Sequence, residues 1–178
     1  MPGRCRLLAP LVFTLGCASA PGTPPSSERV LGIDERTGTV LRTSTDRSPA
    51  TVLQAPIDKV WDAVVSSYVM LNVDLTHRNQ PAGELGNRSF RMSRRFFNRP
   101  VSHYFNCGDD PLLGPTADSY PLTVSFITRL RAEGTGTVLE ISLSGSMSKT
   151  GASSGEVYCA TTGSLETQFA EMVASRID

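Results

Sequence analysis

The sequence has little histidine, few aromatic residues and no excess of charge of either sign. Its 178 residues include 2 histidines and 7% aromatic residues, and 17 Lys and Arg balance 17 Asp and Glu. We expect no nucleic-acid partner, because phosphate binding normally shows as a basic excess. No apolar run approaches the roughly 20 residues that a membrane-spanning helix needs.

The sequence also lacks the short motifs of common enzyme classes, such as the Gly-x-Ser-x-Gly elbow, the phosphate-binding loop and the His-Glu-x-x-His helix. Its two histidines, His77 and His103, belong to no motif. We interpret each as a surface or packing residue, the alternative being a general base. The sequence therefore predicts no catalytic residue, no metal site and no cofactor. An enzyme that uses His103 or the region of Cys107 remains as an alternative.

Enough apolar sequence is present for one folded domain. Hydrophobic residues make up 39% of the chain and charged residues 19%, which is typical of a globular protein. The length suits one domain with short appendages. We expect this domain to occupy residues 38–178.

The N-terminus has the three parts of a secretory signal peptide over residues 1–16. Arg4 and Arg6 form a basic start, residues 7–15 are mostly apolar, and Gly16 is small. Residues 13–17, Phe-Thr-Leu-Gly-Cys, resemble the lipobox of bacterial lipoproteins, in which the signal is removed and the cysteine is acylated. Simple secretion, with cleavage after Ala20, is the alternative.

The lipoprotein resemblance implies that Cys17 is the first mature residue and binds the chain to a lipid bilayer. Residues 17–37 are then a flexible tether, because Ala18–Ser27 is rich in Pro, Ser and Gly. The resemblance implies a protein of the cell envelope that faces the periplasm. Because Ala18, not Asp, follows the cysteine, the family's sorting rule favours the outer membrane over the inner.

Two cysteines, Cys107 and Cys159, remain once Cys5 leaves with the signal and Cys17 carries lipid. An even pair in an oxidising compartment predicts a disulfide. The alternatives are a free thiol, for which His103 is the candidate basic partner, and a metal site, for which neither cysteine has a second ligand at short spacing.

Hydrophobic periodicity predicts two helices and several strands in the domain. Spacings of three and four predict an amphipathic helix from residue 55 to about 70 and a second from about 164 to the end. Alternation predicts strands at 121–131 and 137–147, joined as a hairpin by the Gly-containing turn at 132–136. Further strands are expected within 38–53 and at 72–76, 85–94, 101–106 and 157–159.

This order predicts an α+β fold, with an antiparallel curved sheet and an N-terminal and a C-terminal helix packed on one face. Residues 55–63, Ala-Pro-Ile-Asp-Lys-Val-Trp-Asp-Ala, resemble the opening of helix-grip domains, which include START-like carriers and the C-terminal domains of BamC lipoproteins. The carrier branch implies an apolar small molecule in a cavity, and we expect its lining to include four residues: Phe126, Leu143, Phe169 and Met172.

A stretch at 88–99 is rich in arginine and phenylalanine and contains no acidic residue. Its arginines are Arg88, Arg91, Arg94, Arg95 and Arg99. Arginine interleaved with aromatic residues suits an anion-recognising surface for lipid headgroups, phosphorylated glycans or an acidic protein. The alternative is a charged edge strand whose Phe90 and Met92 face the core.

Taken together, the sequence predicts a membrane-anchored cell-envelope lipoprotein with a non-catalytic binding or accessory domain. Its partner would be the bilayer through Cys17 and an unidentified envelope protein or surface. A small helix-grip carrier of an apolar ligand is the alternative.

Overall fold

The computed structural model describes residues 29–34, 39–43, 50–149 and 155–177. The signal peptide, Cys17 and residues 18–28 of the expected tether lie outside the described residues.

The described chain combines helices with an antiparallel sheet. In chain order the elements are β1 (Arg29–Asp34), β2 (Thr39–Thr43), β3 (Thr51–Leu53), α1 (Ile57–Met70), β4 (His77–Asn79), β5 (Glu84–Met92), β6 (Arg95–Phe96), β7 (Arg99–Pro100), β8 (Phe105–Asn106), β9 (Asp109–Asp110), β10 (Gly114–Pro115), α2 (Thr116–Ser119), β11 (Leu122–Glu133), β12 (Gly136–Lys149), β13 (Gly155–Thr161) and α3 (Ser164–Ala174). The expected mixture of helix and antiparallel strand is confirmed.

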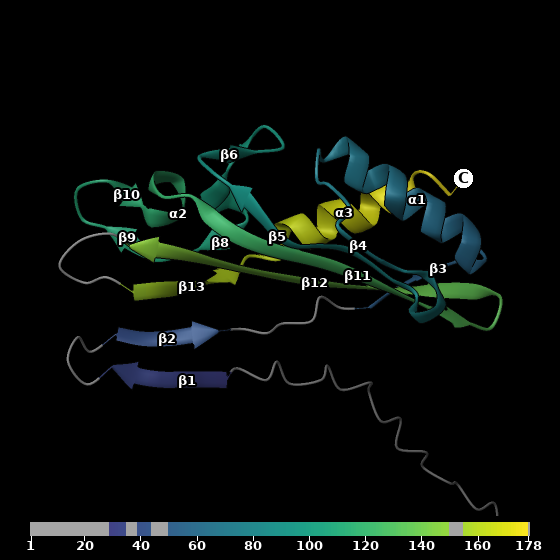
Figure 1. Cartoon of the computed structure of the whole chain (residues 1–178), viewed down its shortest axis with the longest axis horizontal. Coiled ribbons are helices and arrows are strands. Elements are labelled where there is room, and N and C mark those ends of the chain that lie inside the picture. The colour runs from purple at the N-terminus through teal and green to yellow at the C-terminus, as the bar shows by residue number, and fades with distance from the viewer. Residues whose placement is uncertain (1–28, 35–38, 44–49, 150–154, 178) are drawn as a thin grey trace, which may run out of the picture.

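The main sheet has seven strands, in the order β4-β5-β11-β12-β13-β8, with β3 also paired to β12 (Figure 1). Its centre is the long hairpin of β11 and β12, which pair from Thr123–Ser146 to Glu133–Gly136. Along β11 the residues alternate between buried and more exposed positions as far as Arg131. The hairpin predicted from alternation is therefore confirmed.

Helices α1 and α3 contact each other and the central strands. Tyr68 of α1, Phe126 of β11 and Phe169 of α3 meet in the core, with ring centroids 4.8 to 4.9 Å apart. All three side chains are fully buried. Because the three rings come from three elements, they fix how both helices sit on the sheet.

A β-bulge in β5 decides which side chains of the arginine-rich stretch face the core. Phe90 pairs with Val124 and Asn87 with Phe126, so that Arg88 and Ser89 stand opposite one residue of β11. The side chain of Asn87 holds the bulge, accepting from the Ser89 amide and donating to the Asp74 carbonyl. One extra residue reverses the alternation, so the side chains beyond it change faces.

Three expectations about local structure need correction. Residues 72–76 form no strand and lead instead into β4, after Asn72 turns the chain at a φ of 54°. Residues 101–103 form a 3₁₀ turn before β8, so His103 does not lie in a strand. The strand expected at 85–94 ends at Met92, and Arg94 then has a φ of 55° before β6 begins.

Burial of Tyr68 predicts a loss of stability at alkaline pH. Burial raises the pKa of Tyr68 well above its ordinary value of 10.0, and the hydrogen bond with Thr128 opposes part of that rise. Above about pH 10 the unfolded chain loses this proton while the folded chain keeps it. Stability therefore falls as pH rises there, by up to about 1.4 kcal/mol per pH unit.

Urea denaturation of the parent and of Tyr68→Phe, from about pH 9 to about pH 11.5, measures this effect. We expect the variant to lose less stability per pH unit than the parent. Equal slopes for the two chains would contradict the assignment.

Candidate functional site

The arginine-rich stretch continues from β5 into a protruding hairpin. We call residues 94–100, which contain β6 and β7, the arginine hairpin. Strands β6 and β7 pair through Arg95–Pro100 and Phe96–Arg99, so Phe97 and Asn98 form a two-residue turn. The arginines of the stretch, Arg88, Arg91, Arg94, Arg95 and Arg99, are all exposed. Met92 is buried and Phe90 partly buried, as the edge-strand interpretation predicts. The exposed arginines are compatible with both interpretations.

The turn of the arginine hairpin places an aromatic residue where asparagine or glycine is usual. Phe97 and Asn98 have φ values of 39° and 63°, and Arg94, just before the hairpin strands, has a φ of 55°. A two-residue turn with both φ values positive normally carries Asn-Gly. The Phe97 side chain is 39% exposed at this tip. Backbone strain of this kind persists where the surrounding structure supports it.

A row of aromatic rings supports the arginine hairpin from beneath. Phe96 lies between Phe90 and Tyr104, with centroids 6.0 and 5.9 Å away. Tyr104 donates a hydrogen bond from its hydroxyl to Gln168 of α3. Burial raises the pKa of Tyr104, while the Arg99 charge opposes that rise. The hairpin is therefore packed against the domain, which holds its arginines in place.

The arginines of the stretch differ in their partners from Arg129 and Arg131 of β11, which pair with glutamates. Within the described residues, Arg91, Arg94, Arg95 and Arg99 form no ion pair with a carboxylate. Arg95 donates to the carbonyl of Asn98 within its own hairpin. A guanidinium that no carboxylate neutralises is available to an external anion.

A second loop follows the arginine hairpin in the chain. We call residues 109–115, which contain β9 and β10, the leucine loop. Leu112 is 93% exposed and Leu113 is 61% exposed. The carboxylate of Asp110 accepts hydrogen bonds from the amides of both leucines, at 2.9 and 3.1 Å. These bonds shape the loop tip on which the two leucines stand.

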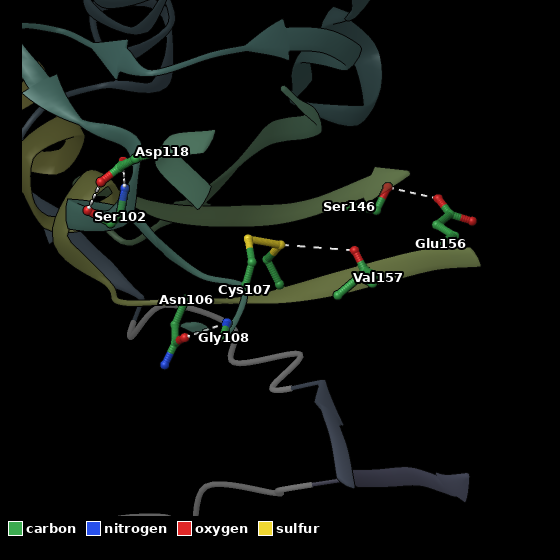
Figure 2. Close-up of a disulfide and its surroundings, with 9 residues drawn as sticks. Ser102, Asn106, Cys107, Gly108, Asp118, Ser146, Glu156 and Val157 are labelled. Carbon is green, nitrogen blue, oxygen red and sulfur yellow. Dashed lines mark hydrogen bonds between the residues drawn. A yellow bond between two sulfur atoms is a disulfide. The ribbon is translucent and has the colours of Figure 1, made fainter. Parts of the chain in front are cut away.

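The two loops share one root. Strand β7 leads directly into the 3₁₀ turn Val101–His103, and β10 leads directly into α2. Asp118 of α2 accepts from the amide and the hydroxyl of Ser102, at 2.8 and 2.7 Å. Figure 2 shows this contact near the Cys107–Cys159 disulfide, which ties the entry of the leucine loop to β13. The predicted disulfide is therefore present.

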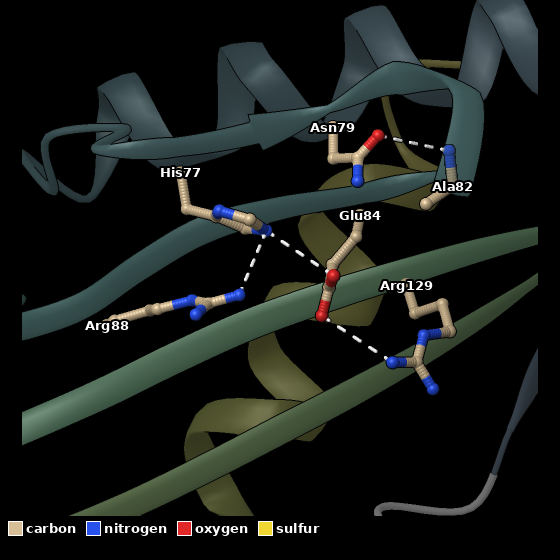
Figure 3. A network of polar contacts seen from close by, with 6 residues as sticks. All are labelled: His77, Asn79, Ala82, Glu84, Arg88 and Arg129. Carbon is tan, nitrogen blue, oxygen red and sulfur yellow. Dashed lines mark hydrogen bonds and ion pairs between the residues drawn. The ribbon is translucent and has the colours of Figure 1, made fainter.

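The sheet face next to the bulge carries a separate polar network (Figure 3). Glu84 pairs with His77 at 3.3 Å and with Arg129 at 3.5 Å, and Arg88 approaches the same His77 nitrogen at 3.4 Å. The Nε2 atom of His77 donates to Glu84 when it carries a hydrogen and accepts from Arg88 when it does not. The network borders an open cleft of about 310 Å³ that also includes Ser125 and Glu140. Its balanced charges give it no selectivity for an anion or a cation.

The two histidines lie in different places, as the lack of a shared motif suggests. His77 is on β4, whereas His103 borders an open, polar cleft of about 470 Å³ with Arg99 and the start of α3. Among the described residues, no group of three or more metal-ligating side chains comes together. Within the same residues, no helix combines the length and apolar character needed to cross a bilayer.

Comparisons with known proteins add no family to this picture. No protein-family model matches the chain, and no curated protein is significantly similar to it in sequence. Sequence reasoning found the arginine stretch but missed the leucine loop. The sequence Asp110-Pro-Leu-Leu-Gly-Pro115 does indicate this loop. Residues typical of turns flank the two leucines, so neither leucine belongs to a periodic element that would bury it.

Proposed function

We propose that this protein is a lipid-anchored cell-envelope protein whose domain is a non-catalytic binding module. Acylated Cys17 holds the chain to a membrane, and the arginine hairpin binds an anionic partner. The domain displays the hairpin outside its packed core. The proposed location is the periplasmic side of the envelope, preferably the outer membrane.

One observation carries the binding role, namely the display of arginines that no carboxylate of the described residues neutralises. Arg94, Arg95 and Arg99 stand on a short hairpin that the rings of Phe90, Phe96 and Tyr104 support. An unsupported surface arginine loses side-chain and backbone entropy on binding. Supporting the backbone beforehand reduces that loss, which favours a role in recognition over a role in solubility alone.

We also propose that the domain is helix-grip-like. The contacts of Tyr68 of α1 and Phe169 of α3 with the same residue, Phe126 of β11, support it, because a helix-grip domain packs both helices on one face of its sheet. A carrier of an apolar ligand would need space between Phe126 and Phe169, whose rings lie 4.8 Å apart. We therefore favour a partner at the surface over a ligand in the interior.

Replacing Cys17 with alanine tests the anchor in the native host. We expect the parent chain to stay with membranes after a high-salt wash, because acyl chains hold by burial rather than by charge. Cys17→Ala should appear in the soluble fraction after the same wash. Cys5→Ala is the matched control and should behave as the parent. Salt-resistant membrane retention of Cys17→Ala would contradict the anchor.

A further inference from the structure

The arginine hairpin and the leucine loop stand on turns that contact each other. Ser102 and Asp118 join the turns on which the two loops stand. The Thr116 amide also donates to the carbonyl of Gly108, at 3.0 Å, which closes the base of the leucine loop. In Figure 1, β9 and β10 lie at the end of β12 that is away from β3, and β6 lies above the sheet on the same half of the domain. The bases of the two loops are therefore joined.

The tips of both loops expose large apolar side chains to water. Leu112 is the most exposed of the large hydrophobic residues, and Leu113 and Phe97 are also exposed. Turn tips normally carry Gly, Asn, Asp or Ser, whose backbone preferences suit them. Leucine has no such preference, and its exposure forfeits the free energy of burial. Apolar tips on supported loops indicate a partner that buries them.

The arginine hairpin is cationic, whereas most carboxylates near the leucine loop accept hydrogen bonds from neighbouring groups. Arg94, Arg95 and Arg99 have no carboxylate partner among the described residues. Asp110 accepts from the loop amides, and the Asp118 carboxylate accepts from Ser102. Asp109 is the exposed acid at the base of the loop. Guanidinium groups bind phosphates, and apolar side chains are stabilised in hydrocarbon. The two together suit the surface of a phospholipid bilayer.

We infer that the two loops together bind the surface of a bilayer that contains anionic phospholipids. Leu112, Leu113 and Phe97 enter the interface, and the hairpin arginines bind lipid phosphates. The inference rests on the proposed function, because it specifies the anionic partner of the arginine hairpin. A soluble anion or an acidic polymer would satisfy the arginines but leave the leucines in water. A bilayer satisfies both.

The test uses the full chain with Cys17→Ala, so that no acyl chain contributes. Binding is measured by co-sedimentation with vesicles of phosphatidylcholine alone, or of equal parts phosphatidylcholine and phosphatidylglycerol. Soluble polyglutamate serves as an anion without a bilayer. Two variants carry the argument, Arg94→Gln/Arg95→Gln/Arg99→Gln and Leu112→Ser/Leu113→Ser. The control for the arginine variant is Arg78→Gln/Arg131→Gln, which changes exposed residues on β4 and β11. The control for the leucine variant is Val52→Ser, which changes an exposed residue on β3.

We expect the Cys17→Ala parent to prefer the anionic vesicles. The arginine variant should weaken that binding by roughly fivefold per arginine, about a hundredfold in all. The leucine variant should weaken vesicle binding by about tenfold yet bind polyglutamate as the parent does. In a third variant, Leu112→Trp, tryptophan emission should shift to the blue on the anionic vesicles, with Trp61 of the parent as the reference. The control variants should bind as the parent does.

The outcomes separate the inference from the proposed function. If the leucine variant binds anionic vesicles as the parent does and Leu112→Trp shows no shift, the membrane inference is wrong. Polyglutamate binding that depends on the arginines would then preserve the proposed function with a soluble or protein partner. If the arginine variant binds both anions as well as the parent, both the inference and the anion-binding role are wrong.

Discussion

Replacing Cys107 and Cys159 together with serine should lower the free energy of unfolding by about 4 kcal/mol. The bridge joins residues 52 apart in sequence, so its loss gives the unfolded chain much more conformational freedom. The closed loop contains α2, β11 and β12, together with the leucine loop and its root. We therefore expect the double variant to fold less stably and to hold the leucine loop less firmly.

Urea denaturation with and without dithiothreitol measures the contribution of the disulfide. The parent chain in reductant should match the double variant, and reductant should leave the double variant unchanged. Hydrogen exchange should show the greatest local loss of protection near the Gly108–Thr116 contact and β8. A parent whose stability is the same with and without reductant would show that the bridge is not formed in solution.

Replacing Phe169 with alanine should lower the free energy of unfolding by about 3 to 5 kcal/mol. The ring is fully buried and contacts both Tyr68 and Phe126, at centroid distances of 4.9 and 4.8 Å. Its removal leaves a cavity between α3 and the sheet that the two remaining rings fill incompletely. The same variant should loosen α3, which supports Tyr104 and the arginine hairpin through Gln168.

Thermal and urea denaturation of Phe169→Ala, with Leu112→Ala beside it, checks this prediction. Leu112→Ala removes an exposed apolar side chain and should change stability by less than about 0.5 kcal/mol. If the two variants lose similar stability, the aromatic cluster does not hold α3 to the sheet. A cavity filled by an apolar molecule would also reveal itself here, since added ligand would restore the stability of Phe169→Ala.

Local sequence patterns were sufficient to predict the elements that show a clear hydrophobic periodicity. The alternation along β11 and β12, with a Gly-containing turn between them, predicts a hairpin because each strand buries one face. Spacings of three and four predict α1 and α3 in the same way. The disulfide followed from the count of cysteines and the expected compartment. These inferences need no knowledge of what the elements pack against.

The features that form the binding surface depend on tertiary structure. The bulge at Arg88 and Ser89 reverses which side chains face the core, and alternation alone gives no sign of it. Where a strand is expected at residues 101–106, residues 101–103 form a 3₁₀ turn whose Ser102 bonds to Asp118, and only Phe105–Asn106 is a strand.

The sequence by itself determined the periodic elements, the cysteine pair and the unusual composition of residues 88–99. Tertiary structure alone decided that all five arginines are exposed, that Phe97 forms a turn tip and that Ser102 and Asp118 join the bases of the arginine hairpin and the leucine loop. The physical reason is that periodicity is a property of neighbouring residues, whereas exposure depends on which distant segments cover a side chain.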